Sequence, residues 1–393
     1  MCNVLTINGG SSSIRFAVFA AGQPAKRLLD GKMERIGGKD AILIANQSGD
    51  APTRIKVAAA DHRTAIDFLM DWLEAQPLFA TIGAVGHRVV HGMLHSDPER
   101  VTTELLDELK GIMAFDPEHL PREIEFIEAL RRRHEQLPQV VCFDTAFHRS
   151  MPRVAAQLAI PRRYAAKGVQ RYGFHGLSYA FLMDELARRG DPAAAHGRVI
   201  LAHLGSGASL AAVRDGKCID TSMGFTPAAG LVMGTRSGDL DPGLMSYLAL
   251  TEALNAAQFQ AMVNHESGLL GISETSADVR DLLERESADQ RAAEAISLFC
   301  YQAKKWIGSF AAALGGLDTL VFSGGIGENA APVRKRISDG LQFLGIEIDA
   351  ARNDRHAARI STDAGSVAVR VIRTDEEVVI AQSTIGLLGL APT

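Results

Sequence analysis

Three glycine-rich segments, each directly after an apolar strand-like run, constrain this chain more than any other feature. They are residues 8–13 (NGGSSS), 203–209 (HLGSGAS) and 324–329 (GGIGEN). Glycine lets the backbone pass close to a phosphate and adopt positive φ, while hydroxyl and N–H groups donate to the phosphate oxygens. One such segment alone is usually a tight turn. Three such segments together predict that a nucleotide binds between two halves of the protein.

The first two segments also indicate a duplicated domain. Strand-like runs at 4–7 and 14–19 flank the first segment, and runs at 198–204 and 208–214 flank the second. Both patterns are typical of a β-hairpin. The same motif at two distant places is a sign of internal repetition. With 393 residues, the chain is also longer than one core usually supports.

Helical patterns alternate with further strand-like runs, which predicts an α/β protein. The helices are expected at 61–75, 103–114, 121–135, 178–189 and 288–314, and the strands at 82–85, 139–143, 319–322 and 367–372. We expect an N-terminal domain over 1–145, completed by a C-terminal helix over 376–393. A second, nucleotide-binding domain is expected over 146–375.

Composition excludes several classes of function. The chain is 47% hydrophobic and 22% charged with a net charge of −5, so it has no general attraction to nucleic acid or to an anionic membrane. Its four cysteines lie far apart, which argues against a zinc site and a disulfide framework. No apolar stretch has the length of a membrane span, and no basic leader is visible. We expect a cytoplasmic protein without a nucleic-acid or membrane partner.

Two charged residues end apolar runs, where α/β folds place ligands. Arg88 is either a surface salt-bridge residue or a bidentate clamp on a carboxylate or phosphate. Asp144 is a helix cap, a Mg²⁺ ligand or a proton acceptor. The histidines at 87, 91 and 95 have a spacing that suits zinc on a helix, but their strand-like, glycine-flanked setting disfavours it.

Two further residues lie in loops of small residues. His175 stands between two glycines and beside two aromatic rings, and we expect it to contact a phosphoryl group. Arg236 precedes a helix and forms a second positive group to pair with Arg88.

The third glycine segment leaves an alternative open. Residues 325–330 match the dinucleotide fingerprint G-x-G-x-x-A, with Glu347 near the distance expected for a ribose contact. A NAD-dependent dehydrogenase is therefore a competing interpretation. It leaves the first two glycine segments and both loop arginines unexplained.

Seven motifs, taken in order, resemble those of the acetate kinases, in the wider group of acetate and sugar kinases, actin and chaperone ATPases. They are residues 8–13, 86–92, 143–148, 172–176, 233–242, 325–329 and 375–381. The resemblance covers nearly the whole chain. It implies two duplicated actin-like (ribonuclease H-like) domains with a nucleotide cleft between them. The implied activity is reversible Mg-ATP-dependent phosphorylation of acetate to acetyl phosphate by direct in-line transfer, in a homodimer.

The resemblance also implies roles for single residues. Magnesium, or Mn²⁺ as the alternative ion, would be positioned by Asn8 and Glu376. The catalytic residues would be Asp144, His175, Arg236 and His119, and the substrate would be bound by Arg88, Val90, Phe174 and Pro227. The residues expected to hold ATP or ADP are Ser11, Ser13, Arg15, His203, Leu204, Gly205, Ser206, Gly207, Asp278, Val279, Arg280, Gly325, Ile326, Gly327, Glu328 and Asn329.

Three positions depart from the family pattern. Ser206 stands where asparagine is usual, Arg15 where lysine is usual, and Glu118 where an apolar leucine is usual. An unpaired carboxylate beside an apolar pocket is costly to bury. Because one methylene discriminates only about 10- to 200-fold, propionate or another short-chain carboxylate is the alternative substrate. A non-enzymatic actin-like or chaperone ATPase is disfavoured, since it would give the two loop arginines no purpose.

Overall fold

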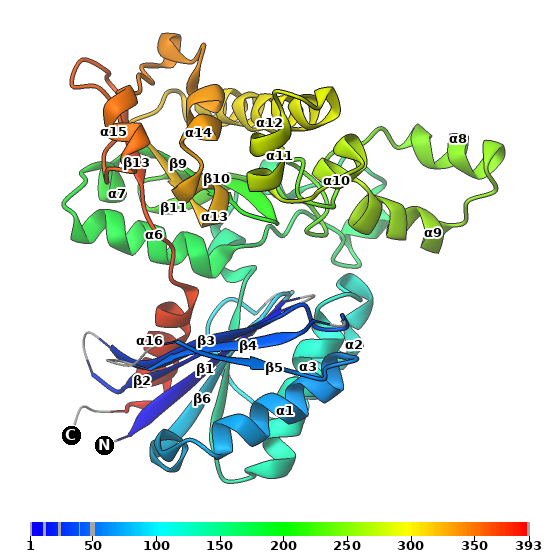
Figure 1. The fold of residues 1–393 in the computed structure, drawn as a ribbon, viewed down its shortest axis with the longest axis vertical. Helices are drawn as coiled ribbons and strands as arrows, with labels where there is room; N and C mark the ends of the chain where they lie inside the picture. The colour runs from blue at the N-terminus through cyan, green and yellow to red at the C-terminus, as the bar shows by residue number, and fades with distance from the viewer. Residues whose placement is uncertain are drawn as a thin grey trace. The chain divides into compact units, whose positions relative to one another are not determined.

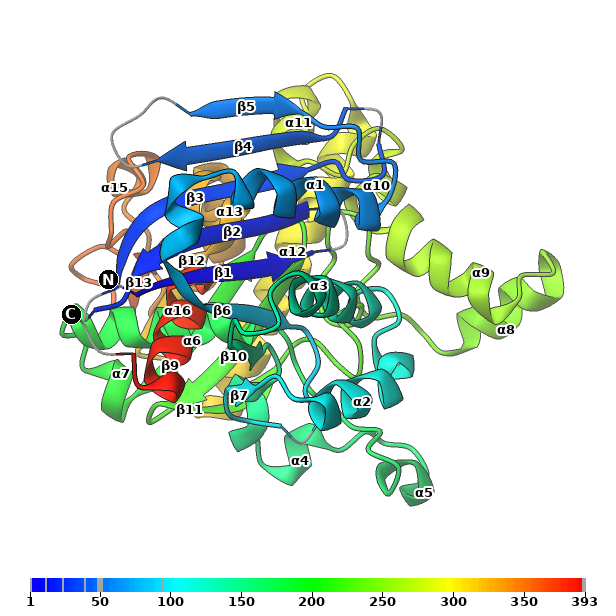
Figure 2. The same ribbon diagram turned by 90° about the horizontal axis from the view of Figure 1, so that it is seen from below.

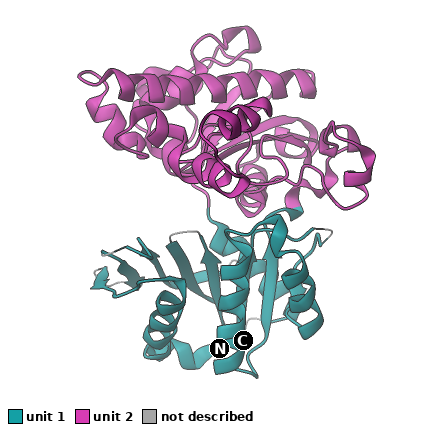
Figure 3. Cartoon of the chain, turned by 90° about the vertical axis from the view of Figure 1, so that its right-hand side faces the viewer, with its two compact units in different colours: residues 1–146, 375–393 teal, residues 147–374 magenta. Residues whose placement is uncertain are grey.

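The computed structural model describes residues 2–10, 13–22, 25–38, 40–47, 52–93 and 95–390. The chain divides into two compact units (Figure 3). Unit 1 comprises Met1–Ala146 with Asp375–Thr393, and unit 2 comprises Phe147–Thr374. Each unit is built on one β-sheet flanked by helices (Figure 1), as the predicted α/β class requires.

The described part of unit 1 holds an eight-stranded sheet in the order β5-β4-β3-β2-β1-β6-β8-β7. Its strands are β1 (Asn3–Gly9), β2 (Ser13–Ala20), β3 (Lys26–Glu34), β4 (Ile42–Gln47), β5 (Thr53–Lys56), β6 (Ile82–Val89), β7 (Glu99–Arg100) and β8 (Gln139–Phe143). Its helices are α1 (His62–Glu74), α2 (Thr103–Gly111), α3 (Leu120–Arg133) and α16 (Glu376–Leu388).

The alternation of side chains along the strands gives this sheet two cores. Leu5 and Ile7 of β1 face the helices α1 and α3, in one cluster with Phe126 and Leu130. Val4, which precedes Leu5 and points to the opposite face, packs against α16 (Figure 2). The C-terminal helix therefore belongs to the core of unit 1, although it is the last element of the chain.

Unit 2 holds, within its described residues, a five-stranded sheet in the order β11-β10-β9-β12-β13. Its strands are β9 (Arg198–Leu204), β10 (Ala208–Arg214), β11 (Lys217–Thr221), β12 (Thr319–Ser323) and β13 (Ala368–Val371). Its helices are α4 (Arg153–Ala156), α5 (Arg162–Ala165), α6 (Gly176–Arg188), α7 (Ala193–His196), α8 (Gly243–Thr251), α9 (Ala256–Ala261), α10 (Gly268–Ser273), α11 (Val279–Arg285), α12 (Gln290–Leu314), α13 (Gly324–Asn329), α14 (Ala331–Ser338) and α15 (Ala350–Asp354). Helix α6 packs on one face of the sheet, and α12 contacts β9 and β10.

The two sheets share one core topology, which confirms the predicted duplication. The order β3-β2-β1-β6-β8 in unit 1 corresponds to β11-β10-β9-β12-β13 in unit 2. In both, the first three strands pair antiparallel and the last three pair parallel. Strands β3, β4 and β5 were not predicted, because β3 and β5 are polar and only partly buried.

Two local predictions need correction. The segment 324–329 is the short helix α13 rather than a glycine-rich loop. Gly324 has φ +76°, and a Cβ there would lie 2.6 Å from the Leu204 carbonyl oxygen, so glycine allows the close approach of α13 to β9. In addition, β6 continues to Val89 beyond the predicted end at 85, which places Arg88 inside the strand.

Replacing Gly86 by alanine should destabilise unit 1. A Cβ on this residue of β6 would lie 2.6 Å from Ile380 Cγ2 and would also collide with the Thr384 hydroxyl, both on α16. Because the sheet and the helix cannot separate freely, we expect a loss of about 1–3 kcal/mol in the free energy of unfolding.

The matched control is Gly111→Ala at the end of α2, where an added Cβ has no neighbour within 4 Å. Urea unfolding followed by Trp72 fluorescence in a Trp306→Phe background reports unit 1 alone, because Trp72 packs on Phe16. Equal midpoints for the two alanine variants would show that α16 does not depend on the small residue at position 86.

Candidate functional site

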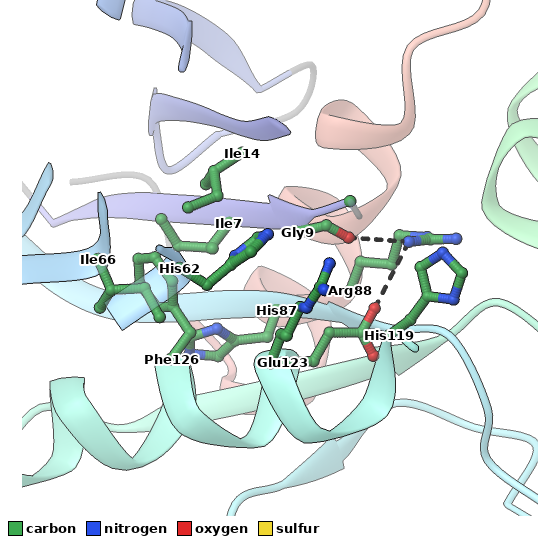
Figure 4. Close-up of a pocket in the computed structure, with 12 residues that line it drawn as sticks. Ile7, Gly9, Ile14, His62, Ile66, His87, Arg88, His119, Glu123 and Phe126 are labelled. Carbon is green, nitrogen blue, oxygen red and sulfur yellow. Dashed lines mark hydrogen bonds and ion pairs between the residues drawn. The ribbon is translucent and has the colours of Figure 1, made fainter. Parts of the chain in front are cut away.

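Arg88 lies at the centre of a charged cluster in unit 1. Its strand β6 runs parallel to β1 and β8, so the C-terminal ends of the three strands meet at one edge of the sheet. Arg88 Nη2 donates to Asp144 Oδ2 at 2.8 Å, and Nη1 donates to the Gly9 carbonyl at 3.1 Å. Glu123 Oε1 lies 3.5 Å from Nη1 (Figure 4). The structure thus brings together two residues that were singled out separately, Arg88 and Asp144.

One donor of the guanidinium has no partner among the described residues. Its side chain is only 13% exposed, and its buried Nε makes no hydrogen bond to any described residue. A buried donor without a partner costs about 1–3 kcal/mol. An oxygen atom of a bound anion could remove that cost. Burial opposes the charge of Arg88, but the carboxylates of Asp144, Glu123 and Glu376 hold its pKa above the ordinary value.

Glu123 is the main residue of this cluster that the sequence analysis missed. Its Oε2 accepts the Val90 N–H at 2.8 Å. Burial raises the pKa of Glu123 to about 8, although the Arg88 charge acts in the opposite direction. Near neutral pH, Glu123 is therefore largely protonated. The available signal was the position of Glu123, one helical turn after His119 on α3.

His119 lines the same small cavity as Arg88 and Glu123. About 20 Å³ of this cavity is open to a water-sized sphere, room for about one water molecule. His119 is buried, and its Nδ1 lies 2.9 Å from Asp116 Oδ1. Burial opposes the charge of Asp116, yet its hydrogen bonds with His119 hold the carboxyl pKa below the ordinary value. An ionised carboxylate only accepts, so Nδ1 carries the proton that is shared with Asp116.

The expected magnesium residues also lie together. Asn8, near the end of β1, donates through Nδ2 to Glu376 Oε2 at 2.8 Å. Glu377 follows, and its burial raises the pKa of its carboxyl group. The Asn8 carbonyl oxygen and the Glu376 carboxylate are the oxygen donors that Mg²⁺ prefers. Among the described residues, no three His, Cys, Asp or Glu side chains converge on one point.

The other unit 1 residues expected to hold nucleotide lie in or just after the first glycine segment. Ser11 lies outside the described residues. The Gly10 N–H donates to the Ser13 carbonyl at 2.7 Å, which closes a tight turn between β1 and β2. Arg15 is exposed on β2 and pairs in register with Asn8. The turn therefore presents Ser13 and Arg15 at the same end of the sheet as Asn8.

In unit 2, His175 and His203 form a stacked pair with ring centroids 4.2 Å apart and an interplanar angle of 18°. His175 Nδ1 contacts Ser209 Oγ at 2.8 Å, and the same hydroxyl contacts Tyr179. Ser178 Oγ contacts His203 Nδ1 at 2.8 Å. The serines and the tyrosine were not predicted, because their contacts join α6 to two different strands.

Arg236 lies near the same pair. A Cβ added to Gly207 would come 3.5 Å from His175 Nε2 and 3.6 Å from Arg236 Nη1, so one glycine contacts both groups. Arg236 Nη1 also donates to the Pro227 carbonyl at 3.0 Å. The second glycine segment thus lies beside an imidazole and a guanidinium. His175, Arg236 and Gly207 therefore lie close together in unit 2.

The remaining residues expected to hold ATP surround the second glycine segment. The Gly234 N–H donates to the Ser206 carbonyl at 2.9 Å, and position 234 also faces Ala277, which precedes Asp278. Asp278 caps α11 by accepting the Arg280 N–H at 2.9 Å, with Val279 between them. His203, Leu204 and Gly205 lead into the segment, and residues 325–329 form most of α13 beside it.

Glu328 fixes the start of α13. Its Oε1 accepts the Gly324 N–H at 3.0 Å and the Thr374 N–H at 3.1 Å. Glu328 is therefore a structural residue in this conformation.

The residues expected to line an apolar pocket fall in both units. Val90 is 2% exposed in unit 1, and Phe174 is 1% exposed in unit 2. Pro227, also in unit 2, is half-buried.

These features define a protein of the duplicated actin-like α/β class, with an arginine–carboxylate cluster in one unit and a histidine–arginine cluster in the other. The acetokinase family model matches residues 3–382. The chain is 42% identical over 388 residues to an acetate kinase of Rhodopseudomonas palustris, covering 96% of each chain. The chain belongs to the acetokinase family.

Two solved structures are similar along their whole length. An acetate kinase of Porphyromonas gingivalis aligns with a TM-score of 0.88 at 34% identity, over 99% of this chain and 100% of that one. A propionate kinase of Francisella tularensis aligns with a TM-score of 0.91 at 36% identity, over 98% and 100%. The family match leaves the dehydrogenase interpretation of residues 325–330 without support.

Replacing Glu123 by glutamine should change how stability depends on pH. The folded pKa of about 8 lies above the ordinary value of 4.5, so the stabilisation from this proton is complete below about pH 4.5 and lost as the pH rises through 8. Glutamine does not titrate. The free energy of unfolding of the variant relative to the wild type should therefore rise with pH, by up to about 1.4 kcal/mol per unit. Urea unfolding between about pH 5 and pH 8 measures it. A difference that stays constant over this range would place the folded pKa of Glu123 near its ordinary value.

Proposed function

We propose that this protein is an acetate kinase that transfers the γ-phosphoryl group of ATP to acetate and forms acetyl phosphate and ADP reversibly. The observation that carries the proposal is Arg88, a mostly buried guanidinium held by Asp144 and the Gly9 carbonyl, in a chain of the acetokinase family. A guanidinium in this setting suits a carboxylate, which accepts two parallel N–H donors.

Each unit would have its own task. In unit 1, Arg88 would bind the substrate carboxylate, and Asn8 with Glu376 would hold magnesium or manganese. In unit 2, the second glycine segment, Asp278–Arg280 and the residues of α13 would bind ATP or ADP. Ser13 and Arg15, with Ser11, would contact the phosphate end. The bound cation would neutralise charge on the phosphate oxygens.

The proposed mechanism needs alignment more than proton transfer. Acetate is already ionised at pH 7, so its oxygen attacks the γ-phosphorus without a general base, and ADP leaves in line with it. Arg236 and His175 would stabilise the negative oxygens of the transferring group. His119 and Asp144 would complete the site around Arg88, with Asp144 as an organiser of water on the cation.

The residues around Arg88 bear on which short carboxylic acid the enzyme prefers. Val90, Phe174 and Pro227 would form an apolar wall for the methyl group, which favours a very short acyl chain. One structural neighbour is a propionate kinase, so propionate is the second candidate. Glu118, half-buried before His119, is the position that departs most from the family's apolar pattern.

The test is a hydroxamate assay of acyl phosphate formation from formate, acetate, propionate and butyrate with Mg-ATP. Acetate should give the highest kcat/KM, with propionate lower by about 10- to 200-fold, the discrimination that one methylene allows. Folded protein that forms acyl phosphate from none of these acids would rule out the proposal.

Arginine variants separate the two roles. Arg88→Ala should mainly raise the acetate KM, by about 10- to 100-fold, the value of a charge-assisted hydrogen bond of about 1.5–3 kcal/mol. Arg236→Ala should mainly lower kcat, by about 10³-fold or more. Arg133→Ala, which removes a surface ion pair with Asp71 on α1, is the control and should leave both constants unchanged. Equal effects of the first two changes on both constants would contradict this division.

We also propose a cytoplasmic homodimer. The four cysteines are free thiols, and no helix among the described residues is long and apolar enough to span a membrane. Helix α8 has the sequence GLMSYLALT but buries none of its residues. Tyr247 is 62% exposed and Leu250 is 87% exposed. A contiguous exposed apolar surface of this kind is typical of a protein interface.

Leu250→Asp should therefore weaken the dimer, because a charge at an apolar interface must be desolvated without a partner. Analytical ultracentrifugation should show a dissociation constant raised at least about tenfold, which is 1.4 kcal/mol. Val154→Asp on α4 is the matched control, since Val154 is also 87% exposed. If both variants dimerise like the wild type, α8 is not the interface.

A further inference from the structure

His175 adopts a backbone conformation that needs support. Its φ of +59° and ψ of 25° lie in the left-handed region, which costs a residue with a side chain roughly 1–2 kcal/mol. Gly173, two residues earlier, also has positive φ, at +75°. The turn that presents the His175 ring is therefore strained, and neighbouring groups must hold it.

His148 holds the preceding peptide. It is 1% exposed, and its Nε2 lies 2.9 Å from the Phe174 carbonyl oxygen, the group that joins Phe174 to His175. A carbonyl oxygen can only accept a hydrogen bond, so Nε2 carries the proton. In the neutral ring, Nδ1 is then an acceptor.

Cys218 supplies the donor for that acceptor. Its Sγ lies 3.2 Å from His148 Nδ1. Burial raises the pKa of the Cys218 thiol well above its ordinary value, so the S–H is retained and can donate. The Cys218 Sγ also lies 3.4 Å from the Asp220 carbonyl oxygen, a second acceptor for the same proton. The contact with Nδ1 is the shorter of the two, so we assign the thiol proton to Nδ1 in the tautomer whose Nε2–H donates to the Phe174 carbonyl.

The ring also fits the turn sterically. A Cβ on Gly173 would lie 2.6 Å from His148 Cδ2 and 2.5 Å from Thr221 Cγ2, so the bare α-carbon is pressed against the imidazole. On its other side the His148 ring meets Tyr179 edge-on, with centroids 5.6 Å apart. Tyr179 contacts Ser209, whose hydroxyl contacts His175 Nδ1. The backbone and the ring of His175 are thus held through one connected set of side chains.

We propose that His148 is a positioning residue for His175, acting through the Phe174 carbonyl, and that Cys218 fixes the tautomer in which it does so. This inference rests on the proposed function only in assigning His175 to the transferring phosphoryl group. The loss of His148 would let the strained turn relax and move the imidazole. A displacement of about 1 Å can cost about 10²-fold in rate.

The test compares two amide replacements at position 148. The amide nitrogen of His148→Gln falls near Nε2 and can still donate to the Phe174 carbonyl, whereas that of His148→Asn falls near Nδ1 and cannot. We expect the asparagine variant to lower kcat by about 10- to 100-fold with the acetate KM changed less than about threefold. The glutamine variant should recover most of that loss. Equal kcat values for the two folded variants would overturn the proposal.

The thiol is tested in the same way. Cys218→Ser keeps a donor and should keep kcat near the wild-type value, whereas Cys218→Ala should lower it. Cys300→Ala is the matched control, because Cys300 is also a buried thiol, and its Sγ contacts the Val333 carbonyl at 4.0 Å. A loss in Cys218→Ala no larger than that in Cys300→Ala would remove Cys218 from the proposal.

A measurement on the wild type needs no variant to fold. Nitrogen-15 NMR of the histidine-labelled protein should show His148 as the neutral Nε2–H tautomer near pH 7. An Nδ1–H tautomer or a charged ring would refute the proposed contacts. This measurement does not depend on turnover. If the protein shows the expected tautomer but has no acetate kinase activity, the missing activity rejects the proposed function, while the proposed contacts of His148 are retained.

Discussion

The parallel pairing of β1, β6 and β8 is the constraint on which the unit 1 cluster depends. It brings the C-terminal ends of three strands to one edge, so that Asn8, Arg88 and Asp144 lie close together although they are distant in sequence. The ion pair between Arg88 and Asp144 then buries a charge with its counter-charge. A second carboxyl group at this buried position can stay only by keeping its proton, which explains the raised pKa of Glu123.

Duplication explains why both units place polar groups at glycine-rich turns. The turn between β1 and β2 in unit 1 corresponds to the turn between β9 and β10 in unit 2. The two turns have diverged in chemistry. Acidic and amide groups that suit a cation lie near the first, whereas a histidine pair and Arg236 lie near the second. One topology thus carries two different sets of polar side chains.

Much of the fold was readable from local patterns. The helix expected at 121–135 is α3, and the strand expected at 139–143 is β8, because both have strong apolar periodicity. The strands β3 and β5 were missed because their apolar alternation is weak. Helix α13 was predicted as a loop because three of its six residues are glycine, which disfavours a helix. Glu123 was missed for another reason. Its importance comes from the side chain of Arg88, which lies on a different element.

The sequence by itself determined the α/β class, the duplication and the identity of Arg88, Asp144, His175 and Arg236 as candidate site residues. These follow from short-range periodicity and from chemistry that belongs to single side chains. Only the tertiary structure decided which groups share a proton or a tautomer. Glu123 near Arg88 and Cys218 beside His148 are such groups. Their protonation depends on burial and on partners from other elements, and neither quantity is local in the chain.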